Sequence, residues 1–168
     1  MQYRIRPAKK NDIKNIIQLA SDMVEHSISP LRDVLFEDVK EYRKKDLDSL
    51  YSSIKDPNIG IFIAETMNGE FIGHVISMSN FVESSTGESQ GYVFDLSVRK
   101  KFNRLGIGAR LMEIAEEYCQ DAGMKYMALN VTASNMPAVK FYESQGYSVE
   151  RKRMLKVISK PEVKNSFS

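Results

Sequence analysis

The residues with the most definite chemical potential lie between positions 98 and 111. A strand-like run ends there, three cations follow (Arg99, Lys100 and Lys101), and Gly106 and Gly108 then open a segment with helical spacing. The first N–H groups of a helix lack partners within it and carry partial positive charge, and glycine lets a ligand approach them closely. The turn therefore predicts a cradle for an anion such as a diphosphate, to which Arg104 and Arg110 would add positive charge.

Two glycines are a weak signal by themselves, because they also serve simply to turn a chain between a strand and a helix. Spacing tests two other phosphate-binding patterns. The P-loop pattern ends in Gly-Lys-Ser/Thr, whereas Gly108 is followed by Ala109 and Arg110. The dinucleotide fingerprint takes a small third residue, and Leu111 stands at that place. Both mismatches argue against an unrelated nucleotide-binding domain.

A second group of residues follows after one more helix and one more strand. Asn135 and Ala138 come first, then the pair Phe141-Tyr142, and then Gly146-Tyr147. Asn135 could also cap a short helix, since Pro137 suits a first helical turn. Either group alone would be a weak motif match, but the two groups in this order, separated by a helix and a strand, form a specific pattern.

Together the two groups resemble the GCN5-related N-acetyltransferase (GNAT) family. The acetyl-CoA loop of that family reads Gln/Arg-x-x-Gly-x-Gly/Ala after a strand ending in Leu-x-Val, and Leu96-Ser97-Val98 supplies that ending. The family's next motif has Asn, Ala, Phe-Tyr and a Gly-aromatic pair at the spacing described above. The resemblance covers residues 91–147 closely and the first ninety residues in layout. It implies a single α/β domain with a mixed, mostly antiparallel twisted sheet, flanked by helices and containing a splayed central strand pair.

The resemblance also implies direct transfer of acetyl from the CoA thioester to a primary amine of a small molecule or a protein, with acetyl-CoA as co-substrate and no metal. Asn103 departs from the family's Gln or Arg, but backbone N–H groups form most of the cradle, so we expect binding to survive. Asn130 stands where ribosomal-protein members carry a catalytic Glu, so that role is not transferred. The implied cofactor-binding residues are Leu96, Ser97, Val98, Asn103, Arg104, Leu105, Gly106, Ile107, Gly108, Ala109, Asn135 and Tyr142.

Acetyl transfer needs a neutral amine, and neutralising an ammonium of pKa ~10.4 at pH 7 costs about 4–5 kcal/mol. Asp95 is the preferred candidate for the base, and the alternative role for it is that of a structural carboxylate bonded to neighbouring backbone groups. Three glutamates on the acceptor side are further candidates for the base: Glu25, Glu83 and Glu88.

Tyr142 is the residue to which the resemblance assigns protonation of the CoA thiolate. A phenol of pKa ~10 gives its proton to a thiolate of pKa ~8.5 uphill by roughly 2 kcal/mol, so a hydrogen bond to the sulfur would suffice. The alternative for Tyr142 is aromatic packing beside Phe141. A backbone N–H near Leu96 to Val98 is the expected donor to the carbonyl oxygen.

Periodicity predicts the elements that position these residues. Strands are expected over residues 3–7, 59–66, 71–79, 91–98 and 127–132, with Asn68-Gly69 as a hairpin turn. Helices are expected from Asn11, which would act as a cap, to residue 24, and over residues 36–54, 106–122 and 135–144. Within the fourth strand, alternation places four residues on one face: Tyr92, Phe94, Leu96 and Val98. Residues 147–158 are predicted to form a final strand or hairpin.

Composition limits the alternatives. The chain has 168 residues, which indicates one domain, placed at residues 1–160 with a tail at 161–168. A net charge of +2 is too weak to predict binding to nucleic acid or an anionic membrane. One cysteine (Cys119) and two histidines (His26 and His74) nearly exclude a Cys/His metal site.

No apolar run approaches the ~20 residues of a membrane helix, and the start of the chain lacks the apolar run of a secretory signal, so a cytoplasmic location is expected. The expected partners are acetyl-CoA and an amine acceptor. The sequence leaves a homodimer open. It also leaves open a non-catalytic acyl-CoA-binding regulatory module, against which Tyr142 argues.

Overall fold

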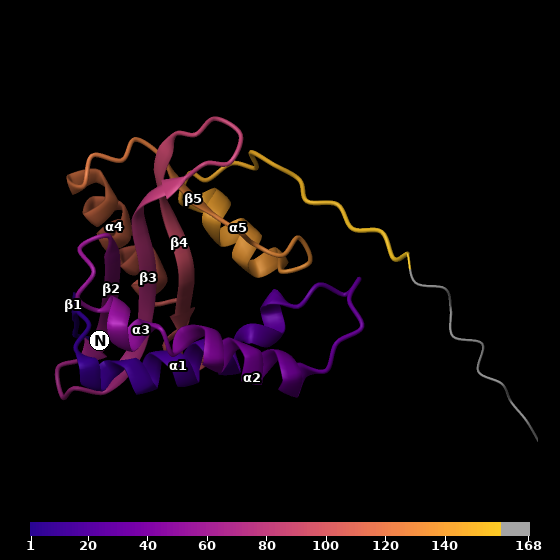
Figure 1. Ribbon diagram of the computed structural model, residues 1–168. Coiled ribbons are helices and arrows are strands. Elements are labelled where there is room, and N and C mark those ends of the chain that lie inside the picture. Colours follow the sequence, from indigo (N-terminus) through magenta and orange to yellow (C-terminus); the bar gives the residue numbers. More distant parts are fainter. Residues whose placement is uncertain (159–168) are drawn as a thin grey trace, which may run out of the picture.

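Five strands form one sheet in the computed structural model, which describes residues 1–158 (Figure 1). The strands lie in the order β1 (Tyr3–Pro7), β2 (Ile59–Thr66), β3 (Phe71–Val82), β4 (Ser89–Val98) and β5 (Met127–Leu129). Neighbouring strands are antiparallel except β4 and β5, which are parallel. The prediction of a mixed, mostly antiparallel sheet is therefore confirmed, whereas the predicted domain boundary at residue 160 and the tail lie outside the described residues.

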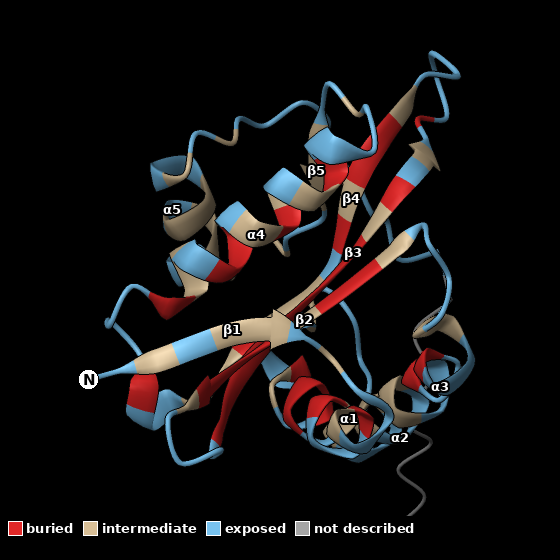
Figure 2. Ribbon diagram, turned by 90° about the vertical axis from the view of Figure 1, so that its left-hand side faces the viewer, coloured by how far each residue is buried: buried red, intermediate tan, exposed pale blue. Residues whose placement is uncertain are grey.

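Helices cover both faces of the sheet, as Figure 2 shows. One face carries α1 (Ile13–Asp22), α2 (Phe36–Leu47) and α3 (Leu50–Ser53), and the other carries α4 (Ile107–Asp121) and α5 (Met136–Ser144). Short 3-10 turns precede α1, follow it and precede α4, at Lys10–Asp12, Val24–Ser27 and Lys100–Phe102. No helix within residues 1–158 combines the length and the apolar character needed to cross a membrane.

Two apolar cores hold these layers together. The first lies between α1 and the sheet and contains Ile13, Ile16, Ile61, Ile63 and Ile76. The second lies under α4 and contains Ile72, Val75, Ile107, Leu111 and Met112. Full burial of such a side chain contributes about 1.5–3 kcal/mol, so both cores hold their helices firmly. By contrast, Leu47 is the buried residue of α2, which is otherwise rich in charge.

The starts and breaks of the N-terminal helices differ in detail from the prediction. The backbone N–H of Lys9 donates to Oδ2 of Asp12 at 2.7 Å, so Asp12 fixes the start of the helical region and the predicted cap at Asn11 is wrong. The predicted helix over residues 36–54 is divided into α2 and α3.

A bulge interrupts β4 at Phe94. Ile76 of β3 lies opposite Asp95, but the next residue of β3, Ser77, lies opposite Val93. Phe94 is therefore an extra residue in the strand, which bends the strand and re-aims its side chains.

The bulge exchanges the two faces of β4. Val93 packs in the core under α4 together with Leu96 and Val98. The predicted common face for Tyr92, Phe94, Leu96 and Val98 is therefore wrong, because alternation was assumed to be regular. Asp95 instead lies beside His74 of β3, to which it is hydrogen-bonded.

The C-terminal part of the described chain also differs from the prediction. β5 ends at Leu129 rather than at residue 132, and residues 148–158 form neither helix nor strand and are exposed. The predicted final strand therefore does not form within a single chain. A strand requires a neighbour for its backbone groups, and none lies beside this segment among residues 1–158.

Candidate active site

The turn before α4 has a conformation that few residues adopt readily. Arg104 and Gly106 have φ angles of 63° and 74°, in the left-handed region that favours glycine. The first hydrogen bond of the helix runs from the N–H of Arg110 to the carbonyl of Gly106 at 3.1 Å. Within residues 1–158 the N–H groups of residues 104–109 donate no hydrogen bond to the protein. A row of free donors thus lies at the positive end of α4, as an anion cradle requires.

The surroundings of this turn fit a diphosphate. Gly108 lies beside α5, and a Cβ there would make an ordinary van der Waals contact with the ring of Phe141 at 3.6 Å. Arg104 is exposed and forms no ion pair within the described chain. Arg110 is turned away, because its guanidinium pairs with Glu113 at 2.7 Å and with Glu117 at 3.4 Å. The cradle therefore consists mainly of backbone groups.

The strands next to this turn splay apart. β4 and β5 are paired only between Gly91–Val93 and Met127–Leu129, and β4 continues to Val98 with β3 as its only strand partner within the described chain. The N–H of Arg99 donates to the carbonyl of Ile72 on β3 at 2.9 Å. Since successive N–H groups of a strand point to opposite sides, those of Leu96 and Val98 point toward the opened side. These two N–H groups match the predicted position of a donor to a carbonyl oxygen.

Helix α5 closes the other side of this opening. The side chain of Asn135 accepts a hydrogen bond from the N–H of Ala138 at 3.3 Å, so the residue caps the helix. Tyr142 packs edge-on against Phe141 and Tyr147, with ring centroids 5.2 and 6.0 Å away. Its hydroxyl forms no hydrogen bond with residues 1–158. Burial, together with the negative charge of Asp95, raises the pKa of Tyr142 to about 12.

Asp95 lies at the centre of a partly buried hydrogen-bond network. Its Oδ1 accepts hydrogen bonds from Nε2 of His74 at 2.8 Å and from Oγ of Ser97 at 2.9 Å. Its Oδ2 accepts one from Nη2 of Arg43 of α2 at 2.7 Å. Burial alone would raise the pKa of Asp95, but the hydrogen bond from His74 and the charge of Arg43 lower it to about 2. A carboxylate of that pKa is a weak base at neutral pH, which favours the second of the two roles open to Asp95.

His74 and Arg43 were missed in the sequence. His74 is fully buried, and its Nδ1 has no hydrogen-bond partner within the described chain. The sequence feature that could have drawn attention to His74 is its position as a single ionisable residue inside an apolar strand. Arg43 gave no signal, because it stands among many charged residues of α2.

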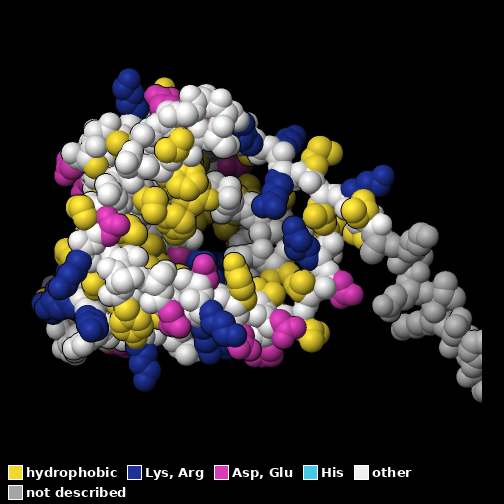
Figure 3. Space-filling view, viewed as in Figure 1, with side chains coloured by type: hydrophobic (Ala, Val, Ile, Leu, Met, Phe, Trp, Pro, Cys, Tyr) yellow, Lys and Arg dark blue, Asp and Glu magenta, His cyan; other side chains and the backbone are white. Residues whose placement is uncertain are grey.

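The face of the sheet beyond this network is aromatic. Phe81, Tyr92 and Phe94 pack together with ring centroids 4.4 to 6.4 Å apart, and Phe94 is 44% exposed. The space-filling view shows hydrophobic side chains gathered over β3 and β4, and a hollow between α2 and α5 (Figure 3). Oγ1 of Thr132 donates to the carbonyl of Ser27 at 2.7 Å and so joins the segment after β5 to the 3-10 turn after α1.

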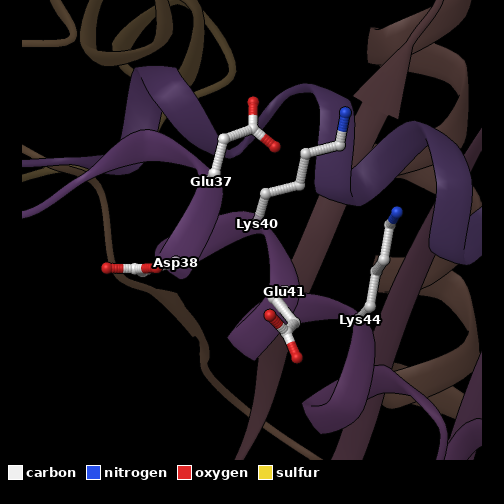
Figure 4. Close-up of a pocket in the computed structure, with 5 residues that line it drawn as sticks. All are labelled: Glu37, Asp38, Lys40, Glu41 and Lys44. Atoms are coloured by element: carbon white, nitrogen blue, oxygen red, sulfur yellow. The ribbon is translucent and has the colours of Figure 1, made fainter.

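Neither Glu83 nor the charged surface of α2 belongs to the network around Asp95. Glu83 accepts hydrogen bonds from the N–H groups of Ser85 and Thr86 and pairs with Arg151 at 2.8 Å, so its charge is already compensated. The close-up of Figure 4 shows a second hollow, on α2, whose charged lining residues have both signs: Glu37, Asp38, Lys40, Glu41 and Lys44. Residues 1–158 hold no cluster of three His, Cys, Asp or Glu side chains that could bind a metal ion.

Residues 22–147 match the acetyltransferase (GNAT) family. The chain belongs to this family. GNAT enzymes transfer acetyl groups from acetyl-CoA, and the chain is therefore an acetyl-CoA-dependent acyltransferase.

Individual relatives agree with this assignment. An uncharacterised N-acetyltransferase of Archaeoglobus fulgidus is 33% identical over 144 residues, which cover 84% of this chain and 90% of the relative. An N-alpha-acetyltransferase of Sulfurisphaera tokodaii is 26% identical over 152 residues, covering 87% and 80%. The solved structure of a provisionally named acetyl transferase from Pyrococcus furiosus has a TM-score of 0.78 and 28% identity, covering 94% of this chain and all of that one.

Proposed function

We propose that this GNAT enzyme acetylates the α-amine at the N-terminus of a polypeptide. The observation that carries the proposal is the state of Asp95, whose pKa of about 2 leaves it a weak base. An α-amine has a pKa of ~7.7–8.0, and its neutralisation at pH 7 costs about 1 kcal/mol. A lysine side chain of pKa ~10.4 costs about 4–5 kcal/mol. A site without a strong base therefore favours the α-amine.

The charges of the site support the same acceptor. The carboxylate of Asp95 is neutralised by Arg43, so the acceptor side offers no strong anionic attraction at this point for a polycation such as a polyamine or an aminoglycoside. Arg43 also pairs with Asp46 at 3.0 Å and keeps further N–H donors. These donors suit the carbonyl oxygen that follows an α-amine in a peptide. The relative from Sulfurisphaera tokodaii carries the name of an N-alpha-acetyltransferase.

We assign roles to the remaining residues on the same basis. The free N–H groups of residues 104–109 bind the diphosphate of acetyl-CoA, which supplies the activated acetyl group. The N–H of Leu96 or Val98 donates to the carbonyl oxygen as negative charge develops on it. Tyr142 donates a hydrogen bond to the departing sulfur. Full proton transfer from a group of pKa about 12 to a thiolate of pKa ~8.5 is uphill by about 5 kcal/mol.

Release of CoA thiol in the presence of three acceptors tests the proposal. The first is a lysine-free peptide with a free N-terminus, the second an N-terminally blocked peptide with one lysine, and the third a polyamine. At pH 7 the neutral fraction of an α-amine exceeds that of lysine by about 300-fold, partly offset by its lower nucleophilicity. We therefore expect kcat/KM for the first peptide to exceed that for the second by at least about 50-fold.

Other outcomes contradict the proposal in different ways. Faster reaction with lysine or with the polyamine would show another amine acceptor. Tight binding of acetyl-CoA without thiol release above hydrolysis, for any acceptor, would favour the non-catalytic regulatory module.

The pH dependence gives a second test of the proposed acceptor. If the substrate amine must lose its proton without a strong protein base, kcat/KM for the free-N-terminus peptide rises about tenfold per pH unit and levels off near pH 8. Asp95 remains ionised throughout this range, so it adds no inflection. A profile already flat at pH 6 would mean that a protein group accepts the proton.

A further inference from the structure

Three aromatic side chains of β3 and β4, named here the aromatic cluster, pack together on one face of the sheet. The ring of Phe81 stacks on that of Tyr92 with centroids 4.4 Å apart, and the ring of Phe94 lies edge-on to both, at 6.4 and 5.1 Å. Phe94 is 44% exposed, although its strand has a neighbour on each side. Aromatic surface that stays exposed inside a sheet is typical of a ligand-binding site.

The aromatic cluster lies on the same face of the sheet as Asp95. Val93 packs in the core under α4, so the side chain of its neighbour Tyr92 points to the opposite face, together with the rings that contact it. Asp95 reaches that face too, since its carboxylate binds Arg43 of α2. The bulge accounts for this arrangement, because the extra residue Phe94 lets two successive side chains face the same way.

The aromatic cluster also borders the opening between β4 and β5. Asn130 is the first residue after β5, where the two strands have separated. Burial raises the pKa of Tyr92, and a hydrogen bond with the side chain of Asn130 partly offsets this effect, so the hydroxyl of Tyr92 lies at the start of the opening. Phe94 is two residues from Leu96, the proposed donor to the reacting carbonyl, and therefore at most about 7 Å from it along the strand. Figure 3 shows the hydrophobic side chains over β3 and β4 beside the hollow.

We infer that the aromatic cluster binds the side chain of the first residue of the acceptor peptide and selects large apolar side chains, such as those of leucine, methionine and phenylalanine. This inference rests on the proposed acetylation of an α-amine. The Cα of the first residue is bonded directly to the nitrogen that attacks the thioester. Its side chain must therefore lie against the surface that adjoins the opening, and on the face of Asp95 the aromatic cluster is such a surface.

The chemistry of the aromatic cluster favours an apolar occupant over a charged one. Asp95, which follows Phe94 in the strand, is paired with Arg43 at 2.7 Å, so its charge is compensated. The hydroxyl of Tyr92 is engaged by Asn130, so the rings present mainly carbon. A charged side chain would lose water there without gaining a partner, whereas an apolar side chain is stabilised by leaving water and by contact with the rings.

Three peptides that differ only in their first residue test the selectivity. They contain no lysine, have a free α-amine and begin with leucine, alanine or aspartate. Leucine and alanine both have apolar side chains, so their α-amines are similarly basic and the ratio of their kcat/KM values isolates the effect of the side chain. We expect a leucine-to-alanine ratio of about 30, because apolar pockets discriminate by about 10–200-fold for one methylene and this cluster is open on one side. The aspartate peptide should react more slowly than the alanine peptide.

Substitutions of Phe94 connect the selectivity to the aromatic cluster. Phe94→Ala should lower the leucine-to-alanine ratio to about 3, whereas Phe94→Leu, which keeps an apolar side chain, should keep it above about 10. Phe94→Arg should make the aspartate peptide a better substrate than the leucine peptide, a gain that an unfolded protein cannot show. Each ratio is measured within one protein, so a loss of folded material does not change it. Tyr51→Ala is the matched control and should keep the wild-type ratio, because Tyr51 of α3 is 42% exposed and lies outside the cluster.

The remaining outcomes separate this inference from the proposed function. Equal kcat/KM values for the leucine and alanine peptides, both above that of the N-terminally blocked lysine peptide, would overturn the inference and leave the α-amine as the acceptor. A faster reaction of the blocked lysine peptide would contradict the proposed function, and the inference with it. A wild-type ratio that survives both Phe94→Ala and Phe94→Arg would place the selecting surface elsewhere. A lower mass in solution for Phe94→Arg with an unchanged ratio would mean that a second copy, and not the acceptor, covers the rings.

Discussion

The proposed cofactor side and the proposed acceptor side of the site are built from different groups. On the proposed cofactor side, the groups that would meet the ligand are backbone N–H groups of residues 104–109 and of the part of β4 that lies beyond its pairing with β5. On the acceptor side, they are side chains brought together from α2, β3 and β4, with Asp95 at their centre. A backbone site depends on local conformation, whereas a side-chain site depends on contacts between distant elements. Substitutions should therefore affect the two sides in different ways.

The largest effect is expected on the cofactor side, from Gly106→Val. Gly106 has a φ of 74°, which a β-branched residue adopts only with strain, so the turn must change and its N–H groups lose their alignment. We expect the Kd for CoA, measured by calorimetry, to rise by about 100-fold, equivalent to about 3 kcal/mol.

A matched control for Gly106→Val exists at the other end of the same helix. Gly123 has a φ of 84° and open space around its Cβ position, so Gly123→Val introduces similar strain far from the cradle. It should lower the melting temperature and leave the Kd for CoA unchanged. Equal loss of CoA affinity in both variants would show that stability alone, and not the cradle, governs binding.

The next largest effect is expected on the acceptor side, from Asp95→Asn, and is measured as a change in the free energy of unfolding. Folding lowers the pKa of Asp95 from its ordinary 3.8 to about 2, so the ionised form stabilises the fold. This contribution is present above about pH 4 and is lost as the pH falls toward 2, and it amounts to about 2 kcal/mol. Urea unfolding should show Asp95→Asn less stable than the wild type at pH 6, with the gap narrowing by pH 3. If the difference in unfolding free energy between the two proteins were the same at pH 6 and pH 3, the ionised Asp95 would not stabilise the fold through this network.

The contrast between backbone and side chains also explains how far the sequence could be interpreted. The glycine turn and the motif around Tyr142 are local patterns, and the structure places both at the opening between β4 and β5. The partners of Asp95 could not be found in this way, because Arg43 lies 52 positions away and His74 lies 21 positions away. Their contact depends on how α2 and β3 pack, which no local spacing encodes.

Two errors of the sequence-based prediction have a related cause. The bulge at Phe94 is set by how β3 and β4 pair, so alternation within β4 alone predicted the wrong face for Val93. Residues 148–158 have the pattern of a strand, but a strand forms only where a neighbour is available. In both cases the decisive information lies in the pairing partner and not in the segment itself.

A smaller effect, again on the cofactor side, is expected from Tyr142→Phe. Loss of the hydroxyl removes the proposed hydrogen bond to the departing sulfur but keeps the ring that packs against Phe141. Turnover should fall by tenfold or more, with little change in the affinity for acetyl-CoA. Tyr147→Phe is the matched control, because its hydroxyl contacts Glu116 instead, and its turnover should stay within about twofold of wild type. Unchanged turnover in Tyr142→Phe would remove the proposed role.

The smallest effect is expected from Arg43, and it distinguishes recognition of the acceptor from support of the fold. Arg43→Gln removes the charge beside Asp95 and the donors proposed to meet the peptide carbonyl, whereas Arg43→Lys keeps the charge and loses the planar fork. We expect KM for a peptide to rise about fivefold in both variants, with kcat and the affinity for CoA little changed. For an alkylamine without the carbonyl, KM should not change in Arg43→Lys, because that amine offers nothing for the fork to bind. An equal rise in KM for both acceptors in Arg43→Lys would mean that Arg43 only holds α2 in place, and the acceptor side would then owe its selectivity to the weak base alone.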